Sequence, residues 1–300
     1  MIVTTRLLGS MLALLVAVPA VAQQQDFSTV EITTQQVADH LYMLMGVGGN
    51  MAVSVGPDGA VLVDTEFAPL SDKIRAAVRQ VGGGDIRFVI NTHWHVDHAG
   101  GNEPFGLAGA LIIAHDNARA RLSTEQFMAF FKQTIPPAPA AALPTLTFPS
   151  RATFHWNGNT VNVFHVGNAH TDGDVVVHFT DSNVFHAGDT FVNGEYPFID
   201  LGSNGELDGL IAAAEGLLAR SDASTKIIPG HGALASRADV QVFHEMLVKI
   251  RANIQPLIDQ GKSEDEAVAA KPTAEFDARW GGSVIDGESF TRLAYQSLKR

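Results

Sequence analysis

Histidine and aspartate are concentrated in one short stretch of the chain, residues 91–102, which reads NTHWHVDHAGGN. Within six positions it holds four potential metal ligands: His93, His95, Asp97 and His98. The stretch follows the apolar run 88–90, and polar groups at the end of a buried strand cost free energy unless they are paired. Imidazole nitrogen and carboxylate oxygen are ligands that zinc prefers, and catalytic zinc sites keep one position open for water. The stretch therefore indicates a catalytic metal site.

Four ligands are too few for two metal ions, but later parts of the chain offer more. Three further candidates each follow an apolar run: His170, Asp189 and His231. The chain contains no cysteine, so no thiolate is available to the site and no disulfide can form. Two neighbouring cations would lower the pKa of a shared water and polarise a carbonyl group, which is the chemistry of a hydrolase.

The elements that must position these residues are mainly short strands. Apolar runs bounded by turn residues predict strands at about 41–44, 51–55, 60–63, 87–90, 111–114, 153–156, 160–166, 175–180, 184–186 and 226–228. Apolar residues at helical spacing predict helices at about 70–81, 116–133, 207–220 and 238–259. Ser71 is the expected cap of the first helix. Residues 263–300 are expected to form a helical tail.

A proline-rich segment, residues 135–149, is the expected seam between two halves of one domain. It holds five prolines, a composition typical of a stiff, extended connector. In each half a series of strands leads to a helix, a further strand and a glycine-flanked histidine loop, at His93 and at His231. Two such halves packed sheet to sheet, with their helices outside, would bring both loops to one edge. The order of elements thus predicts a four-layer α/β arrangement.

The N-terminus, residues 1–22, has the pattern of a cleavable signal peptide. Arg6 precedes an apolar core at 7–18, and Ala20-Val21-Ala22 is a small-x-small cleavage site. An apolar run of about 12 residues is too short for a membrane span, which needs roughly 20. We therefore expect no stable membrane anchor, and a mature protein of residues 23–300 in the periplasm or outside the cell. Removal of Arg6 leaves a formal charge of −13, which disfavours nucleic acid as a partner.

The motifs, in their order and spacing, resemble the metallo-β-lactamase superfamily over about residues 30–249. The residues that carry the resemblance are HWHVDHAGGN at 93–102, GNAHTDGD at 167–174, AGD at 187–189 and PGHG at 229–232. The resemblance implies an αβ/βα sandwich, in which two mixed sheets pack together with helices outside. It also implies two Zn²⁺ ions per chain, with iron or manganese as alternatives. The implied ligands are His93, His95 and His170 for the first ion, Asp97, His98 and His231 for the second, and Asp189 as a bridge between them.

The resemblance is weaker on the substrate than on the metals. In the largest class of metallo-β-lactamases the position of Asp189 is a cysteine, and a lysine three residues later binds the antibiotic carboxylate; here that later position is Val192. An aspartate at the bridging position resembles glyoxalase II and other hydrolases of the superfamily. Four further residues are tentative candidates for supporting a ligand or lining the pocket: Asp64, Asn50, Tyr196 and Asn204. For Asp64, an ordinary buried hydrogen bond is the competing interpretation.

The expected function is a zinc-dependent hydrolase in which a metal-bridging hydroxide opens a carbonyl-containing small molecule, and Asp97 relays the proton. Cyclic amides of the β-lactam type are the first substrates to test, because an exported enzyme can meet an antibiotic. Lactones, esters and thioesters remain alternatives. A mononuclear iron persulfide dioxygenase is a remote alternative. It needs only two histidines and an aspartate, so the complete second set of ligands in this chain argues against it. The sequence leaves the oligomeric state open.

Overall fold

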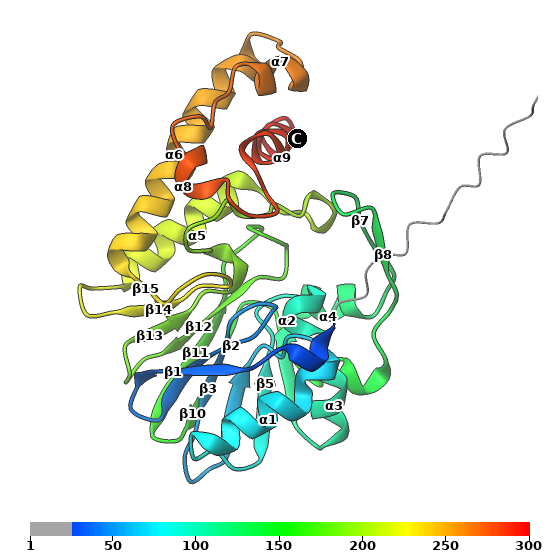
Figure 1. The fold of residues 1–300 in the computed structure, drawn as a ribbon, viewed down its shortest axis with the longest axis vertical. Coiled ribbons are helices and arrows are strands. Elements are labelled where there is room, and N and C mark those ends of the chain that lie inside the picture. The colour runs from blue at the N-terminus through cyan, green and yellow to red at the C-terminus, as the bar shows by residue number, and fades with distance from the viewer. Residues whose placement is uncertain (1–25) are drawn as a thin grey trace, which may run out of the picture.

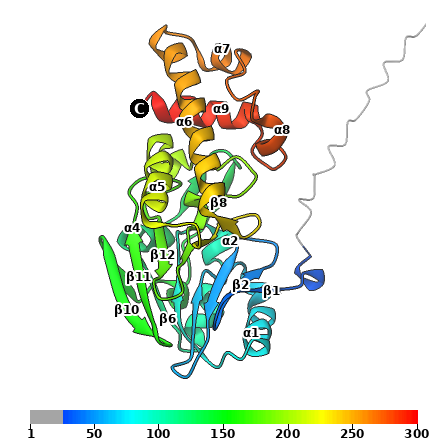
Figure 2. The ribbon, with the colours of Figure 1, turned by 90° about the vertical axis from the view of Figure 1, so that its left-hand side faces the viewer.

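The computed structural model describes residues 26–300, so the predicted signal peptide lies outside the described residues. Two β-sheets pack face to face, and helices cover their outer faces (Figures 1 and 2). Each sheet mixes antiparallel and parallel strands. The predicted four-layer α/β sandwich is therefore confirmed.

The first sheet has seven strands in the order β1-β2-β3-β4-β5-β6-β9. Their bounds are Thr33–Ala38, Leu41–Met45, Met51–Ser54, Ala60–Val63, Ile86–Ile90, Leu111–His115 and Leu146–Phe148. Strands β1 to β4 pair antiparallel, whereas β4, β5, β6 and β9 pair parallel. The parallel pairing brings the carboxyl ends of β4 and β5 to the same edge of the sheet. The helices of this half are α1, α2, α3 and α4, at Ser71–Gln80, Val96–Ala99, Asn102–Leu107 and Asp116–Leu122.

The second sheet has six strands in the order β10-β11-β12-β13-β14-β15. Their bounds are Arg151–Trp156, Asn159–His165, Val175–Phe179, Val184–His186, Lys226–Ile228 and Ala235–Ser236. Only β13 and β14 pair parallel in this sheet, so their carboxyl ends also share one edge. Helix α5, Leu207–Arg220, connects these two strands, and helix α6, Arg237–Asp259, follows β15.

Three apolar clusters correspond to the three interfaces between the four layers. The central cluster joins the inner faces of both sheets through side chains such as Val63, Ile90 and Val177. A second cluster lies between the first sheet and α1, and a third packs α5, α6 and the C-terminal helices against the second sheet. Because both faces of most strands are buried, the strands read as continuous apolar runs rather than as alternating ones.

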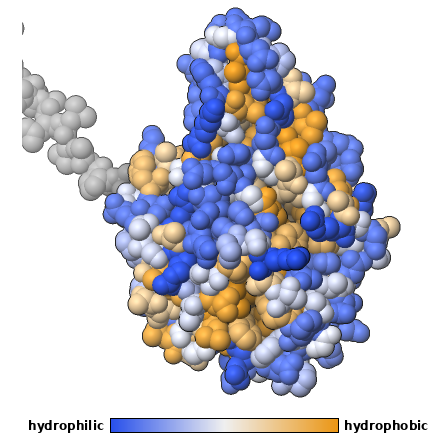
Figure 3. Space-filling view, turned by 180° about the vertical axis from the view of Figure 1, so that it is seen from behind, coloured by the Kyte–Doolittle hydropathy of each residue, from blue (hydrophilic) through white to orange (hydrophobic). Residues whose placement is uncertain are grey.

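The C-terminal segment forms a helical projection beside the sandwich. Helices α7, α8 and α9, at Glu264–Ala269, Asp277–Trp280 and Gly287–Leu298, pack with α6 at one end of the molecule (Figures 1 and 2). On the face turned away in Figure 1, hydrophobic residues gather low on the body and along a narrow band of this projection (Figure 3). Within residues 26–300, we find no helix with the length and apolarity that a membrane crossing requires.

Two local predictions are wrong. The helix expected at 116–133 ends at Leu122, because the hydroxyls of Ser123 and Thr124 bond the carbonyls of Arg119 and Ala120 and so compete with its continuation. The chain then forms a separate hairpin of two strands, β7 at Gln126–Met128 and β8 at Gln133–Ile135.

The second wrong prediction concerns Ser71, which lies inside α1 rather than capping it. The helix continues directly from a 3-10 turn at Ala68–Leu70, so its first turn needs no side-chain cap. The proline-rich segment 135–149 also contains regular structure, namely the end of β8, a 3-10 turn and β9. The chain passes from the first sheet to the second between Phe148 and Arg151.

Candidate metal centre

All seven candidate ligands come from segments that follow strands at one edge of the sandwich. His93 and His95 follow β5, and Asp97 and His98 occupy the first turn of the short helix α2. The remaining three come from the second sheet: His170 after β11, Asp189 in a 3-10 turn after β13, and His231 after β14. The tertiary structure therefore joins two halves of a site whose nearest members, His98 and His170, are 72 positions apart in the chain.

The seven side chains form overlapping groups whose ligand atoms lie within 4.8 Å of one another. One group contains His93, His95 and His170, another contains Asp97, His98 and His231, and a third links His93 and His98 to Asp189.

Asp189 lies between the first two groups. Its Oδ1 is 3.1 Å from His98 Nε2, and its Oδ2 is 3.5 Å from His170 Nε2 and 3.5 Å from His231 Nε2. This placement matches that of a residue able to contact two ions at once.

Hydrogen bonds on the outer sides of the rings leave nitrogen lone pairs directed into the centre. His170 Nδ1 donates to the carbonyl oxygen of Phe198 at 2.7 Å, and His95 Nε2 donates to Asp200 Oδ2 at 3.0 Å. The other nitrogens of these two rings then face each other at 2.8 Å, where two lone pairs repel unless a proton or a cation lies between them. The buried His93 Nε2 has no hydrogen-bond partner among the described residues. The donor set thus fits a bound metal cation.

Burial keeps the imidazoles of the first group in the form that binds metal. It lowers the pKa of His93 well below its ordinary value and the pKa of His170 to about 4, so both rings are neutral at neutral pH. Burial alone would raise the pKa of Asp200, but the hydrogen bonds from His95 and Ser203 and the charge interactions with His95 and His170 together outweigh it and lower that pKa to about 2. Asp200 is therefore an anion that holds the His95 N–H on the side away from the centre.

In the second group the pKa of His231 is raised rather than lowered. Burial alone would lower the pKa of His231, but the neighbouring carboxylates of Asp189 and Asp97 raise it to about 10. Without a metal this ring carries a proton at neutral pH. A cation that binds there must displace that proton, so its binding strengthens as the pH rises.

Asp64 is hydrogen-bonded to His98 of the second group directly and to His93 of the first group through Thr92. Its side chain is fully buried at the end of β4, where the backbone has a φ of +61°. Its Oδ1 accepts from the Thr92 backbone N–H at 2.8 Å, and its Oδ2 accepts from the Thr92 hydroxyl at 2.7 Å and from His98 Nδ1 at 2.8 Å. The Thr92 hydroxyl accepts in turn from His93 Nδ1 at 3.0 Å. One carboxylate thereby fixes the proton on His98 directly and on His93 through Thr92, which leaves both Nε2 atoms free.

The loop that carries the first four ligands is closed at its two ends by a pair of buried asparagines. Asn91 and Asn102 exchange side-chain hydrogen bonds at 2.9 and 2.8 Å, and Thr65 donates to Asn102 at 3.1 Å. Gly49 lies against the same loop, with its N–H on the carbonyl of Asp97 at 3.0 Å. A β-carbon on Gly49 would come within 2.0 Å of the His98 ring, so only glycine fits there.

The turn at 46–49 is held in place by a buried carboxyl group. Buried Glu66 accepts from the Val47 N–H at 3.3 Å, and burial raises the pKa of this carboxyl group. Glu66 had no sequence signal of its own, because a single acid after the predicted strand 60–63 is indistinguishable from a surface residue.

The other three tentative residues have distinct positions. Asn50 donates to the carbonyls of Pro229 and Gly232, both at 2.9 Å, and so braces the loop that carries His231. Asn204 donates to Asp172 at 2.9 Å and does not line the cleft at the metal centre. Tyr196 lines that cleft, but its hydroxyl donates to Asp277 at 2.9 Å, toward the C-terminal helices.

A cleft of about 220 Å³ opens over the candidate ligands. It is lined by ligands together with side chains of the β7–β8 hairpin, the loop after β13 and the C-terminal segment: Met128, Phe131, Val192, Glu195, Tyr196, Phe198, Ser283, Val284 and Ile285. Among the tentative candidates from the sequence, Tyr196 lines this cleft, but the sequence did not predict the contributions of the hairpin or of 283–285. These segments carry no motif, and only packing brings them to the site.

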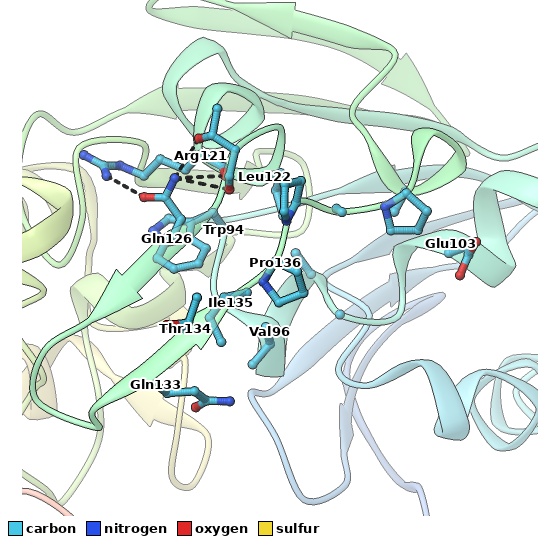
Figure 4. A pocket seen from close by; sticks show the side chains of 17 residues that line it. Trp94, Val96, Glu103, Arg121, Leu122, Gln126, Gln133, Thr134, Ile135 and Pro136 are labelled. Carbon is cyan, nitrogen blue, oxygen red and sulfur yellow. Dashed lines mark hydrogen bonds between the residues drawn. The ribbon is translucent and has the colours of Figure 1, made fainter.

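A separate cavity of about 340 Å³ lies beside the ligand loop (Figure 4). Trp94 and Val96 line it, whereas His95 and Asp97 line the metal cleft, so alternate residues of one string serve two cavities. The hairpin also borders both, with Gln133 and Ile135 on one side and Phe131 on the other.

The family profile that matches this chain and the solved structures that resemble it both indicate metallo-β-lactamases. The profile of the metallo-beta-lactamase superfamily matches residues 45–231. The fold is similar to the crystal structure of DIM-1 metallo-beta-lactamase, with a TM-score of 0.59 and 19% identity over 73% of this chain and 98% of that one. It is also similar to a metallo-beta-lactamase from Pontibacter korlensis, with a TM-score of 0.58 and 18% identity over 73% of this chain and 99% of that one.

A relative in sequence is a hydroxyacylglutathione hydrolase of a Polaromonas species, 30% identical over an alignment of 120 residues that covers 36% of this chain. The match spans 46% of that relative, less than half of its length. Because the superfamily profile matches more than half of the chain, the protein belongs to the metallo-β-lactamase superfamily. It has the fold of that superfamily and carries histidine and aspartate clusters that can bind metal.

Proposed function

We propose that this protein is a dinuclear zinc hydrolase that opens a carbonyl-containing small molecule. One observation carries the proposal: the seven predicted ligands converge, and the buried Nε2 of His93 points into their centre with no hydrogen-bond partner among the described residues. The first ion would be held by His93, His95 and His170, and the second by Asp97, His98 and His231, with Asp189 contacting both.

When bound, such ions lower the pKa of a water molecule and polarise the substrate carbonyl. Hydrolysis adds the water oxygen to the carbonyl carbon, breaks the bond to the leaving nitrogen or oxygen, and moves one proton to the leaving group. Asp97 is suited to hold that proton, because its side chain is 28% exposed toward the cleft and its Oδ2 lies 3.3 Å from His231 Nε2. Phe198 covers His95 and His170, at ring-centroid distances of 6.0 and 5.8 Å, and limits the entry of bulk water.

Two substrate groups are supported by different observations. The β-lactam candidate is supported by the predicted export and by the fold of the metallo-β-lactamases above. The lactone, ester or thioester candidate is supported by the aspartate at 189 and by similarity to a hydroxyacylglutathione hydrolase.

Metal analysis coupled to a substrate panel tests this function. We expect the purified mature protein to contain about two zinc ions per chain. We expect it to hydrolyse at least one of nitrocefin, a lactone, a para-nitrophenyl ester and a thioester, with activity lost to a chelator and restored by zinc. H93A should lose metal and activity together, whereas H155A, at an exposed histidine on β10, should keep both. A single iron per chain together with oxygen uptake would refute the zinc hydrolase.

We also propose that the protein is exported, on the strength of the sequence pattern at residues 1–22. Expression of the full chain in a Gram-negative host should yield a periplasmic protein whose N-terminal residue is Gln23. A cytoplasmic product that retains Met1 would contradict this proposal.

A further inference from the structure

We propose that the cleft selects neutral substrates that carry an apolar group beside the scissile carbonyl, with Phe131 and Glu195 as specificity-determining residues. This inference rests on the hydrolase function proposed above and specifies its substrate class. It follows from the charge of the cleft and from the character of its walls.

The cleft beyond the metal ligands contains one charged side chain, and that side chain is acidic. Among the described residues that line it, none is lysine or arginine, and Glu195 is the only acid that is not a candidate ligand. The Glu195 carboxylate makes no hydrogen bond or ion pair with another residue in the range 26–300. A substrate carboxylate near Glu195 would be repelled by its negative charge, and no basic side chain in the described lining could pair with it. The bound metal ions would be the remaining positive charge, and the carboxylates of Asp97 and Asp189 partly offset that charge.

One wall of the cleft is aromatic and is built by the β7–β8 hairpin together with Phe198. Phe131, in the turn of the hairpin, meets Phe198 edge to face with ring centroids 5.2 Å apart, and the Phe130 ring lies 5.5 Å from the same ring. Met128 of β7 also lines the cleft. Because Phe198 also contacts the rings of His95 and His170, this wall begins at the metal centre itself.

Apolar side chains at the rim remain exposed, which costs free energy unless a ligand covers them. Phe131 is 43% exposed and Val284, on the C-terminal segment, is 73% exposed, and both line the cleft. Ile285 and Val192 continue the apolar surface inward. An acyl chain or ring lying against these side chains would bury their surface at the moment of binding.

The class of substrate that fits is a neutral ester or lactone with an apolar acyl group. A β-lactam with its ring carboxylate fits less well, since the described lining of the cleft offers no lysine or arginine to pair with the carboxylate and Glu195 adds a like charge. A glutathione thioester, which carries two carboxylates, fits least.

A matched pair of esters tests the inference on the zinc-loaded protein. Para-nitrophenyl pentanoate and mono-para-nitrophenyl succinate share a leaving group and a similar acyl length, but only the second carries a carboxylate. We expect kcat/KM to favour the pentanoate by at least about tenfold. E195K should reduce this preference at least about fivefold by improving the succinate ester, and E195Q should have a smaller effect in the same direction. E245K, at an exposed position of α6 outside the cleft, should leave the ratio unchanged.

The aromatic wall is tested with the same assay. F131A should lower kcat/KM for the pentanoate about tenfold and for the corresponding acetate less, since the acetate lacks the carbons that reach the wall. Hydrolysis with a preference for the succinate ester, or a ratio unmoved by E195K and F131A, would refute the inference while leaving the hydrolase function intact. Failure of the zinc-loaded protein to hydrolyse any ester, lactone, thioester or β-lactam would refute the hydrolase function and this inference with it.

Discussion

Substitution of Asp64 by asparagine is expected to weaken metal binding about 10–100-fold, although Asp64 itself is not a candidate ligand. The carboxylate accepts three hydrogen bonds, from the Thr92 N–H, the Thr92 hydroxyl and His98 Nδ1. In either orientation an asparagine amide turns an NH₂ group against at least one of these donors. The least costly response is for His98 to move its proton to Nε2, where it would point into the metal centre.

Zinc retained against a graded series of chelator concentrations measures this effect, and activity should fall in parallel. D239N provides a control, because Asp239 accepts from Ser236 in the capping box of α6 and should affect only the free energy of unfolding, by about 1 kcal/mol. If D64N keeps the metal affinity of the wild type and loses only thermal stability, Asp64 has a purely structural role.

Substitution of Asp189 is expected to have the largest effect on metal content. Its two oxygens contact His98, His170 and His231, so it is the residue that reaches both halves of the centre. D189N removes one negative charge between two sites of positive charge. We expect metal content to fall from about two toward about one ion per chain, and turnover to fall by more than the 10–100-fold typical of a supporting residue.

D189C separates charge from geometry. A thiolate restores the charge but offers a single sulfur atom in place of two oxygens, so we expect metal content to recover more than activity. D208N, at an exposed aspartate of α5, is the matched control for charge removal. Wild-type metal content and activity in both Asp189 variants would show that Asp189 does not bridge the two ions.

The chemistry of the site could be predicted from the sequence because most of its ligands form local strings. His93, His95, Asp97 and His98 lie on one loop, and its composition by itself indicates metal binding. Most of the strands were predictable for a related reason: burial on both faces makes a strand a continuous apolar run. The helix at 116–133 was mispredicted because Phe127, Phe130 and Phe131 suit a strand or a helix equally well. In the structure Phe130 and Phe131 pack against Phe198, a contact distant in the chain that the local sequence does not show.

The sequence by itself determined the ligand types, their order along the chain and the four-layer class of fold. Only the tertiary structure decided which groups fix the ligand protons and which side chains form the cleft. Asp200 and the Phe198 carbonyl hold His95 and His170, and residues 283–285 form part of the rim. The physical reason is that these contacts join segments distant in the chain, and their directions depend on side-chain packing and backbone path, which leave no periodic pattern in the sequence.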